Sequence, residues 1–120
     1  MIRGVKFVSI PVTDQDRALK FYTETLGFRL VTDQPFSPEQ RWIELGIPGA
    51  ETKLVLFRFG EELKPGSQMN ISFWTDDVEG TFRELKSKGV NFLKEPKKED
   101  WGTAVIFMDP DGNRFVLGTK

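Results

Sequence analysis

The same order of elements occurs twice along the 120 residues of this chain. In each half, an apolar strand-like run is followed by an amphipathic helical pattern and then by three further strand-like runs. Residues of the same type recur 61 to 63 positions apart. The pairs are Ser9 and Ser72, Asp14 and Asp77, Gly27 and Gly89, Pro48 and Pro110, and Val55 and Val116. The pattern indicates an internal duplication, so the fold has to accommodate two copies of one β-α-β-β-β unit.

The first half is predicted to contain one strand, one helix and three more strands. The first strand covers residues 4–12, and the helix runs from about 14 to 26. Thr13 and Asp14 supply N-cap oxygens for that helix, and Gly27 suits a left-handed residue after its last turn. Three further strands are separated by turns that contain Pro and Gly, and they lie at 28–34, 41–46 and 53–59.

The second half repeats this order with different residues. A strand is expected at 69–75 and a helix at about 76–88. One face of that helix carries Val78, Phe82 and Leu85, a stripe that predicts packing against a sheet. Three strands follow, near 90–95, 103–108 and 113–118.

Two connections and the domain boundaries complete the predicted organisation. The DPDGN stretch at 109–113 predicts a tight reversal between the last two strands, because Pro fixes φ while Gly and Asn tolerate positive φ. The charged stretch KKEDWG at 97–102 has no strand pattern and is predicted to be a loop. The length suits one compact domain over 1–120, with its two modules at about 1–62 and 66–120.

Composition excludes several classes of function. A total of 17 Lys and Arg against 18 Asp and Glu gives a net charge of −1, so no long-range field recruits nucleic acid or an anionic membrane. The apolar runs are far shorter than the roughly 20 residues that span a bilayer. Because Cys is absent and no signal-peptide pattern is visible, we expect a cytoplasmic protein. The absence of His removes the commonest metal ligand and general base.

Four segments together resemble the vicinal oxygen chelate superfamily, which contains glyoxalase I, extradiol dioxygenases, fosfomycin-resistance proteins and bleomycin-resistance proteins. The segments are residues 7–28, 41–57, 71–90 and 102–117. The resemblance implies an α+β fold of two paired βαβββ modules whose strands form a curled mixed sheet cup. It also implies that the cup is completed within a homodimer and that the partner is a small organic molecule.

In metal-using members of that superfamily, the first and last strands of each module carry the metal ligands. The resemblance places these four positions at Phe7, Val55, Asn70 and Val116. Phenyl and isopropyl groups offer no donor atom, and a lone Asn amide is a weak ligand. We therefore predict no metal and no other cofactor, and we place the chain nearest to the metal-free, bleomycin-resistance-like branch.

Displaced metal ligands are the alternative to a lost site. Glu44, Asp33, Asp76 and Asp77 supply carboxylates, but Asp76 and Asp77 fit helix caps better and Glu44 fits the polar face of an edge-type strand. A nucleophile paired with a base is also not visible, because the Ser and Thr residues have no His beside them. No catalytic residue is therefore predicted, which weighs against an enzyme.

Loss of the ligands leaves room for an apolar binding site. Phe7, Val55 and Val116 are predicted to line it. Asn70 and Ser72 share one face of a strand by two-residue alternation, and they are expected to supply an amide and a hydroxyl. The alternative for this pair is that both face solvent or bond across strands.

Three tryptophans and one arginine are further candidates. Trp42 and Trp101 are predicted to contact a planar ligand, and Trp74 is a third Trp able to stack. For Trp42 and Trp74 the alternative is packing in the core or in a dimer, and for Trp101 it is a lid, an interface or simple exposure. Arg41 is predicted to pair with an anionic ligand, with a surface ion pair as the alternative.

Three functions remain open at this point. The leading hypothesis is a metal-independent protein that sequesters or senses a small organic molecule in a dimeric cup. The second is a lyase or isomerase of the glyoxalase or dioxygenase type, with displaced or absent metal ligands. The third is a dimeric interaction module whose cup has collapsed.

Overall fold

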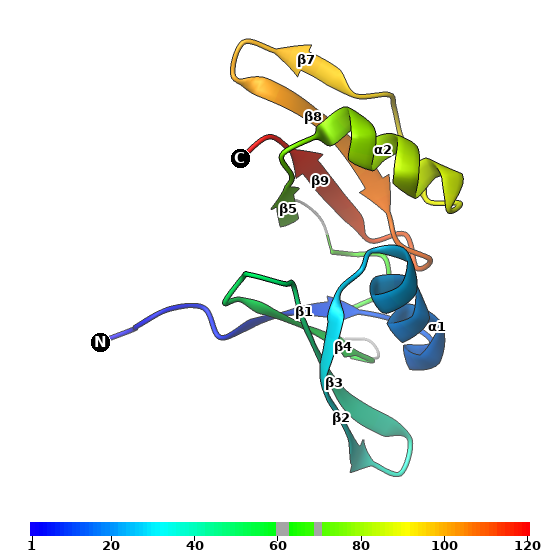
Figure 1. The fold of residues 1–120 in the computed structure, drawn as a ribbon. Helices are drawn as coiled ribbons and strands as arrows, with labels where there is room; N and C mark the ends of the chain where they lie inside the picture. The colour runs from blue at the N-terminus through cyan, green and yellow to red at the C-terminus, as the bar shows by residue number, and fades with distance from the viewer. Residues whose placement is uncertain (60–62, 69–70) are drawn as a thin grey trace. The chain divides into compact units, whose positions relative to one another are not determined.

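The computed structural model of the chain describes residues 1–59, 63–68 and 71–120. The chain divides into two units, Met1–Pro65 and Gly66–Lys120, and each contains one mixed sheet and one helical segment (Figure 1). The α+β class predicted from the sequence is confirmed. In the part of the chain that the structure describes, no helix has the length and apolar character needed to cross a membrane.

The first unit contains four strands in the order β1-β4-β3-β2. β1 and β4 are parallel, whereas β3 pairs antiparallel with both β4 and β2. Residues 4–6 of the predicted first strand lie outside β1, because pairing with β4 begins at Phe7 opposite Lys53. The elements are β1 Phe7–Pro11, α1 Gln15–Lys20, a π-helical turn Phe21–Thr25, β2 Arg29–Ser37, β3 Gln40–Gly46 and β4 Lys53–Phe57.

The second unit repeats this arrangement in the order β5-β9-β8-β6, with β7 also paired to β8. Its first and last strands, β5 and β9, are again parallel. Ser9 lies opposite Val55 in the first unit and Ser72 lies opposite Val116 in the second, so the predicted duplication extends to the strand register. The elements are β5 Ile71–Trp74, α2 Val78–Ser87, β6 Asn91–Phe92, β7 Lys97–Glu99, β8 Gly102–Met108 and β9 Arg114–Gly118.

Two predicted segments differ from the observed ones. The stretch at 97–102 is a loop only at residues 100–101, the turn of a hairpin. Residues 97–99 form β7, in which Lys97 lies opposite Ala104 and forms an ion pair with Glu99 at 3.3 Å. Its charged side chains are typical of an exposed edge strand, where charge discourages pairing with other chains. The strand predicted near 90–95 is reduced to the two residues of β6.

The helical segments begin and end where the sequence predicts. Asp14 Oδ1 accepts a hydrogen bond from Arg17 N, and Gly27 has a φ of 81°. The second half of the first segment is nevertheless π-helical, with Leu26 N donating to Phe21 O. Within this segment the Thr23 hydroxyl donates to Leu19 O at 2.6 Å, a contact that competes with the backbone donors.

The cap of α2 supplies a first prediction. Asp77 Oδ1 accepts from Gly80 N at 2.9 Å, which satisfies one of the unpaired amides of the first turn. Asp77→Ala is expected to lower the free energy of unfolding by about 1 kcal/mol. Urea denaturation measures this, and Asp76→Ala removes the same charge one residue earlier as a control. Equal losses in the two variants would show that charge, and not the cap, accounts for the effect.

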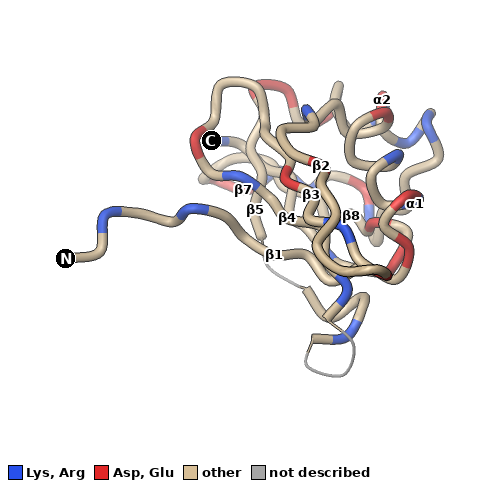
Figure 2. Tube along the Cα trace, turned by 90° about the horizontal axis from the view of Figure 1, so that it is seen from below, with Lys and Arg blue, Asp and Glu red and all other residues tan. Residues whose placement is uncertain are grey.

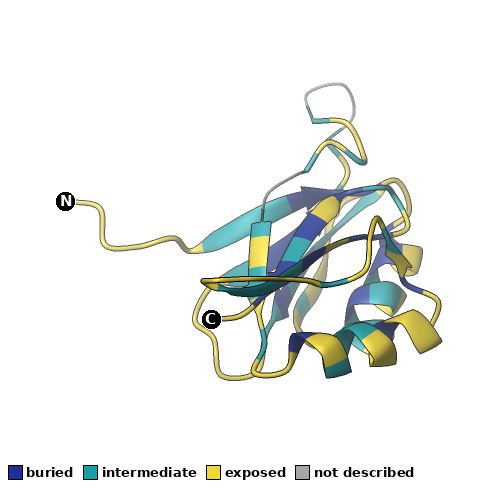
Figure 3. Cartoon of the chain, turned by 90° about the horizontal axis from the view of Figure 1, so that it is seen from above, coloured by how far each residue is buried: buried dark blue, intermediate teal, exposed yellow. Residues whose placement is uncertain are grey.

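Each sheet buries one face against its helix (Figure 3). In the first unit Ile10, Ile43 and Leu45 are buried, together with Tyr22 from the π-helical turn. In the second unit the predicted stripe of α2 is buried at Val78 and Leu85, whereas Phe82 is half-buried with its ring centroid 4.7 Å from that of Phe92. Lys and Arg are interspersed with Asp and Glu along both units (Figure 2).

The predicted reversal at 109–113 is a hydrogen-bonded unit. Asp109 Oδ1 accepts from the backbone amides of Asp111 and Asn113, and Asp109 Oδ2 accepts from Asn113 Nδ2 at 2.8 Å. Asn113 Oδ1 in turn accepts from Gln68 N at 3.0 Å. Both Asp109 and Asn113 are buried, and these hydrogen bonds satisfy their polar atoms and hold the reversal.

Candidate ligand-binding face of the first sheet

The two faces of the first sheet differ in what covers them. Residues alternate between faces along a strand, and Arg41 contacts Asp16 of α1, so the face of Arg41 and Ile43 is the one toward the helix. The opposite face carries Trp42, whose ring centroid lies 5.5 Å from that of Phe57 in β4. The face without α1 is therefore the candidate site.

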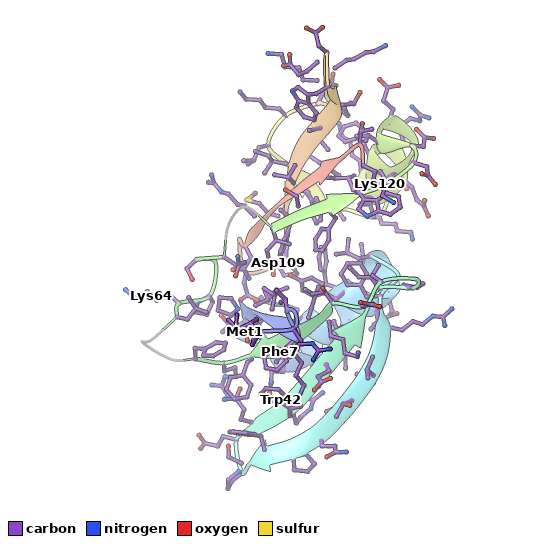
Figure 4. The ribbon with its side chains drawn as sticks, turned by 90° about the vertical axis from the view of Figure 1, so that its left-hand side faces the viewer. Met1, Phe7, Trp42, Lys64, Asp109 and Lys120 are labelled. Carbon is purple, nitrogen blue, oxygen red and sulfur yellow. The ribbon has the colours of Figure 1, made fainter. Side chains whose placement is uncertain are left out.

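Five aromatic rings form a continuous group on this face. The ring of Trp42 lies 5.4 Å from that of Phe7 and 5.9 Å from that of Phe36. The ring of Phe57 lies 5.2 Å from that of Phe36 and 5.0 Å from that of Phe59. Phe36 is 61% exposed and the other four rings are half-buried. We call this group, Phe7, Phe36, Trp42, Phe57 and Phe59, the aromatic face; Figure 4 shows Phe7 beside Trp42.

A carboxylate lies at the border of the aromatic face. Glu44 is opposite Val55 in the register, and Val55 is in turn opposite Ser9. Glu44 Oε1 accepts from Trp42 Nε1 at 2.8 Å, which fixes the orientation of the indole. The expectation of an edge-type strand at Glu44 is wrong, because β2 pairs with β3 on its other side and makes β3 an interior strand.

Arg41 points to the other face. Its guanidinium bonds to Asp33 through Nε and Nη2 at 3.0 and 3.1 Å, and Nη1 bonds to Asp16. These hydrogen bonds, first to Asp33 and then to Asp16, raise the pKa of Arg41 above its ordinary value. The arrangement favours the ion-pair alternative for Arg41 over recognition of an anionic ligand.

The remaining candidates belong to the second unit. Ser72 and Val116 are opposite each other on β5 and β9. Trp74 is exposed, with Lys120 Nζ 4.5 Å from its ring centroid. Trp101 is 68% exposed at the tip of the β7–β8 hairpin. Asn70 lies outside the described residues.

The described residues at the positions where the resemblance places metal ligands do not fit a metal. Phe7, Val55 and Val116 carry no donor atom in their side chains. Among the described residues, no three His, Cys, Asp or Glu side chains come together in a way that would hold an ion. Asp33 accepts from Arg41, and Asp77 caps α2, so two of the acids considered as displaced ligands have structural partners.

Several residues of the aromatic face were not predicted from the sequence. Phe57 and Phe59 follow Val55 at two-residue intervals, so strand alternation was the available signal for placing them beside it. Phe36 lies beyond a register shift in β2, and alternation counted from the start of that strand does not place it. Nothing in the sequence indicated that Gln15 would be buried.

Comparison with known proteins gives one family. The model of the Glyoxalase/Bleomycin resistance protein/Dioxygenase superfamily matches residues 4–117. The uncharacterized protein YetH of Bacillus subtilis strain 168 is 42% identical over 119 residues, which cover 98% of each chain. A lactoylglutathione lyase of Haemophilus influenzae is 30% identical over 113 residues, or 87% of this chain and 83% of the enzyme.

Solved structures agree with this assignment. TnmS3, an antibiotic binding protein from Streptomyces sp. CB03234, superposes with a TM-score of 0.90 and is 40% identical, covering 98% of this chain and 96% of its own. A superfamily member from Sphaerobacter thermophilus superposes with a TM-score of 0.89 and is 37% identical. The match covers 99% of this chain and 98% of the Sphaerobacter chain.

Proposed function

Because the chain belongs to the Glyoxalase/Bleomycin resistance protein/Dioxygenase superfamily, we propose that it is a metal-independent protein that sequesters or senses a small organic molecule. The aromatic face is the observation that carries this proposal. Its five rings expose a continuous apolar surface on the side of the first sheet away from α1. The similarity to an antibiotic binding protein supports the same class of function.

The chemistry of the aromatic face favours a planar aromatic ligand. Aromatic pairs prefer offset or edge-to-face contact, and the ring of Trp42 meets the rings of Phe7 and Phe57 edge to face. A flat ligand therefore finds both ring faces and ring edges. The Glu44 carboxylate at the border adds an acceptor, so a ligand with an N–H group or a positive charge is favoured over an anion.

Homodimerisation is the second part of the proposal. Proteins of this superfamily commonly form dimers, and the second unit leaves Trp74, Trp101 and Ile106 exposed in the single chain. Trp74 and Ile106 lie on the same face of the second sheet, and exposed apolar side chains that gather on one face are typical of a surface that another chain covers. Sedimentation equilibrium is expected to give twice the mass of the chain, and a monomer at micromolar concentration would remove this part of the proposal.

Titration with a planar cationic dye tests the binding proposal. Proflavine, with three fused rings, is expected to bind, and cyclohexylamine, a cation without an aromatic ring, is not. Trp42→Ala and Phe57→Ala are each expected to weaken proflavine binding about tenfold, which corresponds to about 1.4 kcal/mol for a lost aromatic contact. The measurement is the change in dye fluorescence on titration.

Phe21→Ala is the matched control, because Phe21 is an aromatic residue of the same unit that lies in the helical segment. It is expected to leave the dissociation constant unchanged. Equal weakening by Phe21→Ala and Trp42→Ala would place binding elsewhere. If planar cations, phenols and aromatic antibiotics all fail to bind, the interaction-module alternative is the better account.

A lactoylglutathione lyase type of activity is the second candidate. Identity of 30% to the Haemophilus influenzae enzyme favours it, and so does the position of the Glu44 carboxylate beside Val55, one of the superfamily's ligand positions. The assay measures S-lactoylglutathione formed from methylglyoxal and glutathione, with and without added Zn²⁺ or Ni²⁺. No turnover is expected. Turnover that disappears in Glu44→Gln would favour the enzyme.

A further inference from the structure

The β2–β3 hairpin separates from β4 in its outer half. Pairing between β3 and β4 runs from Gly46 opposite Lys53 to Ile43 opposite Leu56 and ends there. The same register, continued by two residues on each strand, would bring Arg41 opposite Arg58. β2 and β3 remain paired beyond this point, out to Ser37 opposite Gln40. The two strands of the hairpin therefore remain paired with each other where they no longer pair with β4.

Two glutamine side chains bond to the peptide groups of Arg41 and Arg58, which this separation leaves outside the pairing between β3 and β4. Gln15, which is 6% exposed, accepts from Arg41 N at 3.0 Å. Its Nε2 donates to Arg41 O at 2.7 Å and to Leu56 O at 3.0 Å. Gln40 accepts from Arg58 N at 2.8 Å and donates to Arg58 O at 2.9 Å. A carboxamide has the same donor and acceptor groups as a peptide, so each side chain replaces a strand partner.

The separation opens a pocket on the helix side of the hairpin. Its volume is about 600 Å³, and Gln15, Gln40, Arg41 and Arg58 are among the residues that line it. The lining is polar and charged, unlike the mostly apolar lining of typical small-molecule sites. We therefore attribute the pocket to the separated strands and do not assign a ligand to it.

The same separation bears directly on the aromatic face. Phe36 and Trp42 belong to the hairpin, whereas Phe57 belongs to β4 and Phe59 follows it. Any change in the distance between hairpin and β4 alters the contacts of the Phe57 ring with the rings of Phe36 and Trp42, now 5.2 and 5.5 Å. The ion pair of Arg41 with Asp16 holds the hairpin to α1 at the same place, and the ion pair of Arg41 with Asp33 lies within the hairpin.

We infer that Gln15 and Gln40 are positioning residues, whose carboxamides fix the spacing between the hairpin rings and the β4 rings and so select the size of the planar ligand. The selection of ligand size rests on the proposed function, because the ligand is the one bound by the aromatic face. The effect of the carboxamides on the position of the hairpin concerns the free protein alone. Without the carboxamides, the amides of Arg41 and Arg58 lose these acceptors and the hairpin moves further from β4.

The experiment compares Gln15→Ala and Gln40→Ala with Glu39→Ala, a change in the adjacent turn residue of the same hairpin. All three variants are made in a Trp74→Phe, Trp101→Phe background, which leaves Trp42 as the single Trp. In the free protein, both glutamine variants are expected to shift Trp42 emission. They are also expected to accelerate amide hydrogen exchange at Arg41 or Arg58, while Leu45 stays protected. Glu39→Ala is expected to change neither.

The second measurement uses two dyes of different size, proflavine with three rings and 1-methylquinolinium with two. The ratio of the two dissociation constants is expected to change about fivefold or more in the glutamine variants and to stay constant in Glu39→Ala. Equal weakening of both dyes would overturn the positioning role and leave a purely structural one. Unchanged Trp42 emission and exchange would overturn it too. If neither dye binds the unaltered protein, the proposed function fails. Trp42 emission and amide hydrogen exchange in the free protein still decide whether the carboxamides fix the position of the hairpin relative to β4.

Discussion

Phe115→Ala is expected to lower the free energy of unfolding by about 4 kcal/mol, the middle of the range for large aromatic residues in cores. The Phe115 side chain is fully buried, and its ring centroid lies 5.3 Å from that of Phe73 and 5.4 Å from that of Phe107. Removing it leaves a cavity next to two rigid rings that cannot close it without leaving their own contacts. Urea denaturation followed by far-ultraviolet circular dichroism measures the change.

Trp101→Ala is the control for this prediction, because it removes a larger aromatic side chain from an exposed position of the same unit. Its expected effect is about 0.5 kcal/mol or less. If Phe115→Ala lowers the free energy of unfolding by less than about 1.5 kcal/mol, the core of the second unit repacks easily around the missing ring, which would contradict the prediction.

Gln15→Glu is expected to destabilise the protein by about 3 kcal/mol at pH 7. The substitution replaces Nε2, which donates to Arg41 O and Leu56 O, with an oxygen that faces two carbonyl oxygens in a buried site. Burial and these two acceptors raise the pKa of the introduced carboxyl above the value it has in the unfolded chain. The measurement is the free energy of unfolding as a function of pH.

The sign of the pH dependence follows from linkage. With the pKa higher in the folded state, the folded protein binds more protons, so stability relative to the unaltered protein falls as pH rises. The penalty is smallest below about pH 4.3, the ordinary pKa of Glu, and grows through the folded-state pKa. Gln34→Glu, an exposed change on the same hairpin, is expected to show no such dependence. A parallel pH profile for the two variants would contradict the bridging role of Gln15.

Much of the fold was predictable because its strands, helices and caps depend on residues close together in sequence. Two-residue and helical alternation identify most of the strands and both helices, and the repeated order predicts two equivalent units. The register bears this out at Ser9 with Val55 and Ser72 with Val116. Asp14 and Asp77 cap their helices as predicted, since an N-cap depends on a side chain only three residues away.

Features that depend on contacts far apart in sequence were not predictable. Gln15 bonds to Arg41 and Leu56, 26 and 41 residues away, and nothing in its neighbourhood distinguishes it from a surface glutamine. The face of Arg41 could have been obtained from alternation with Trp42, but its partners Asp16 and Asp33 come from two other elements. The short strand β7 is charged throughout, and only its pairing with β8 identifies it as a strand.

The parallel pairing of first and last strands has a consequence for synthesis on the ribosome. Phe7 pairs with Lys53 and Ile71 pairs with Phe115, so each opening strand finds its partner only after most of its unit has been made. Until then, the opening strand has no partner for its backbone amides and carbonyls. Contacts between residues this far apart in sequence form slowly. Each unit therefore completes its sheet as a single late event, and a nascent chain that stops short of β9 carries β5 without the strand that it needs.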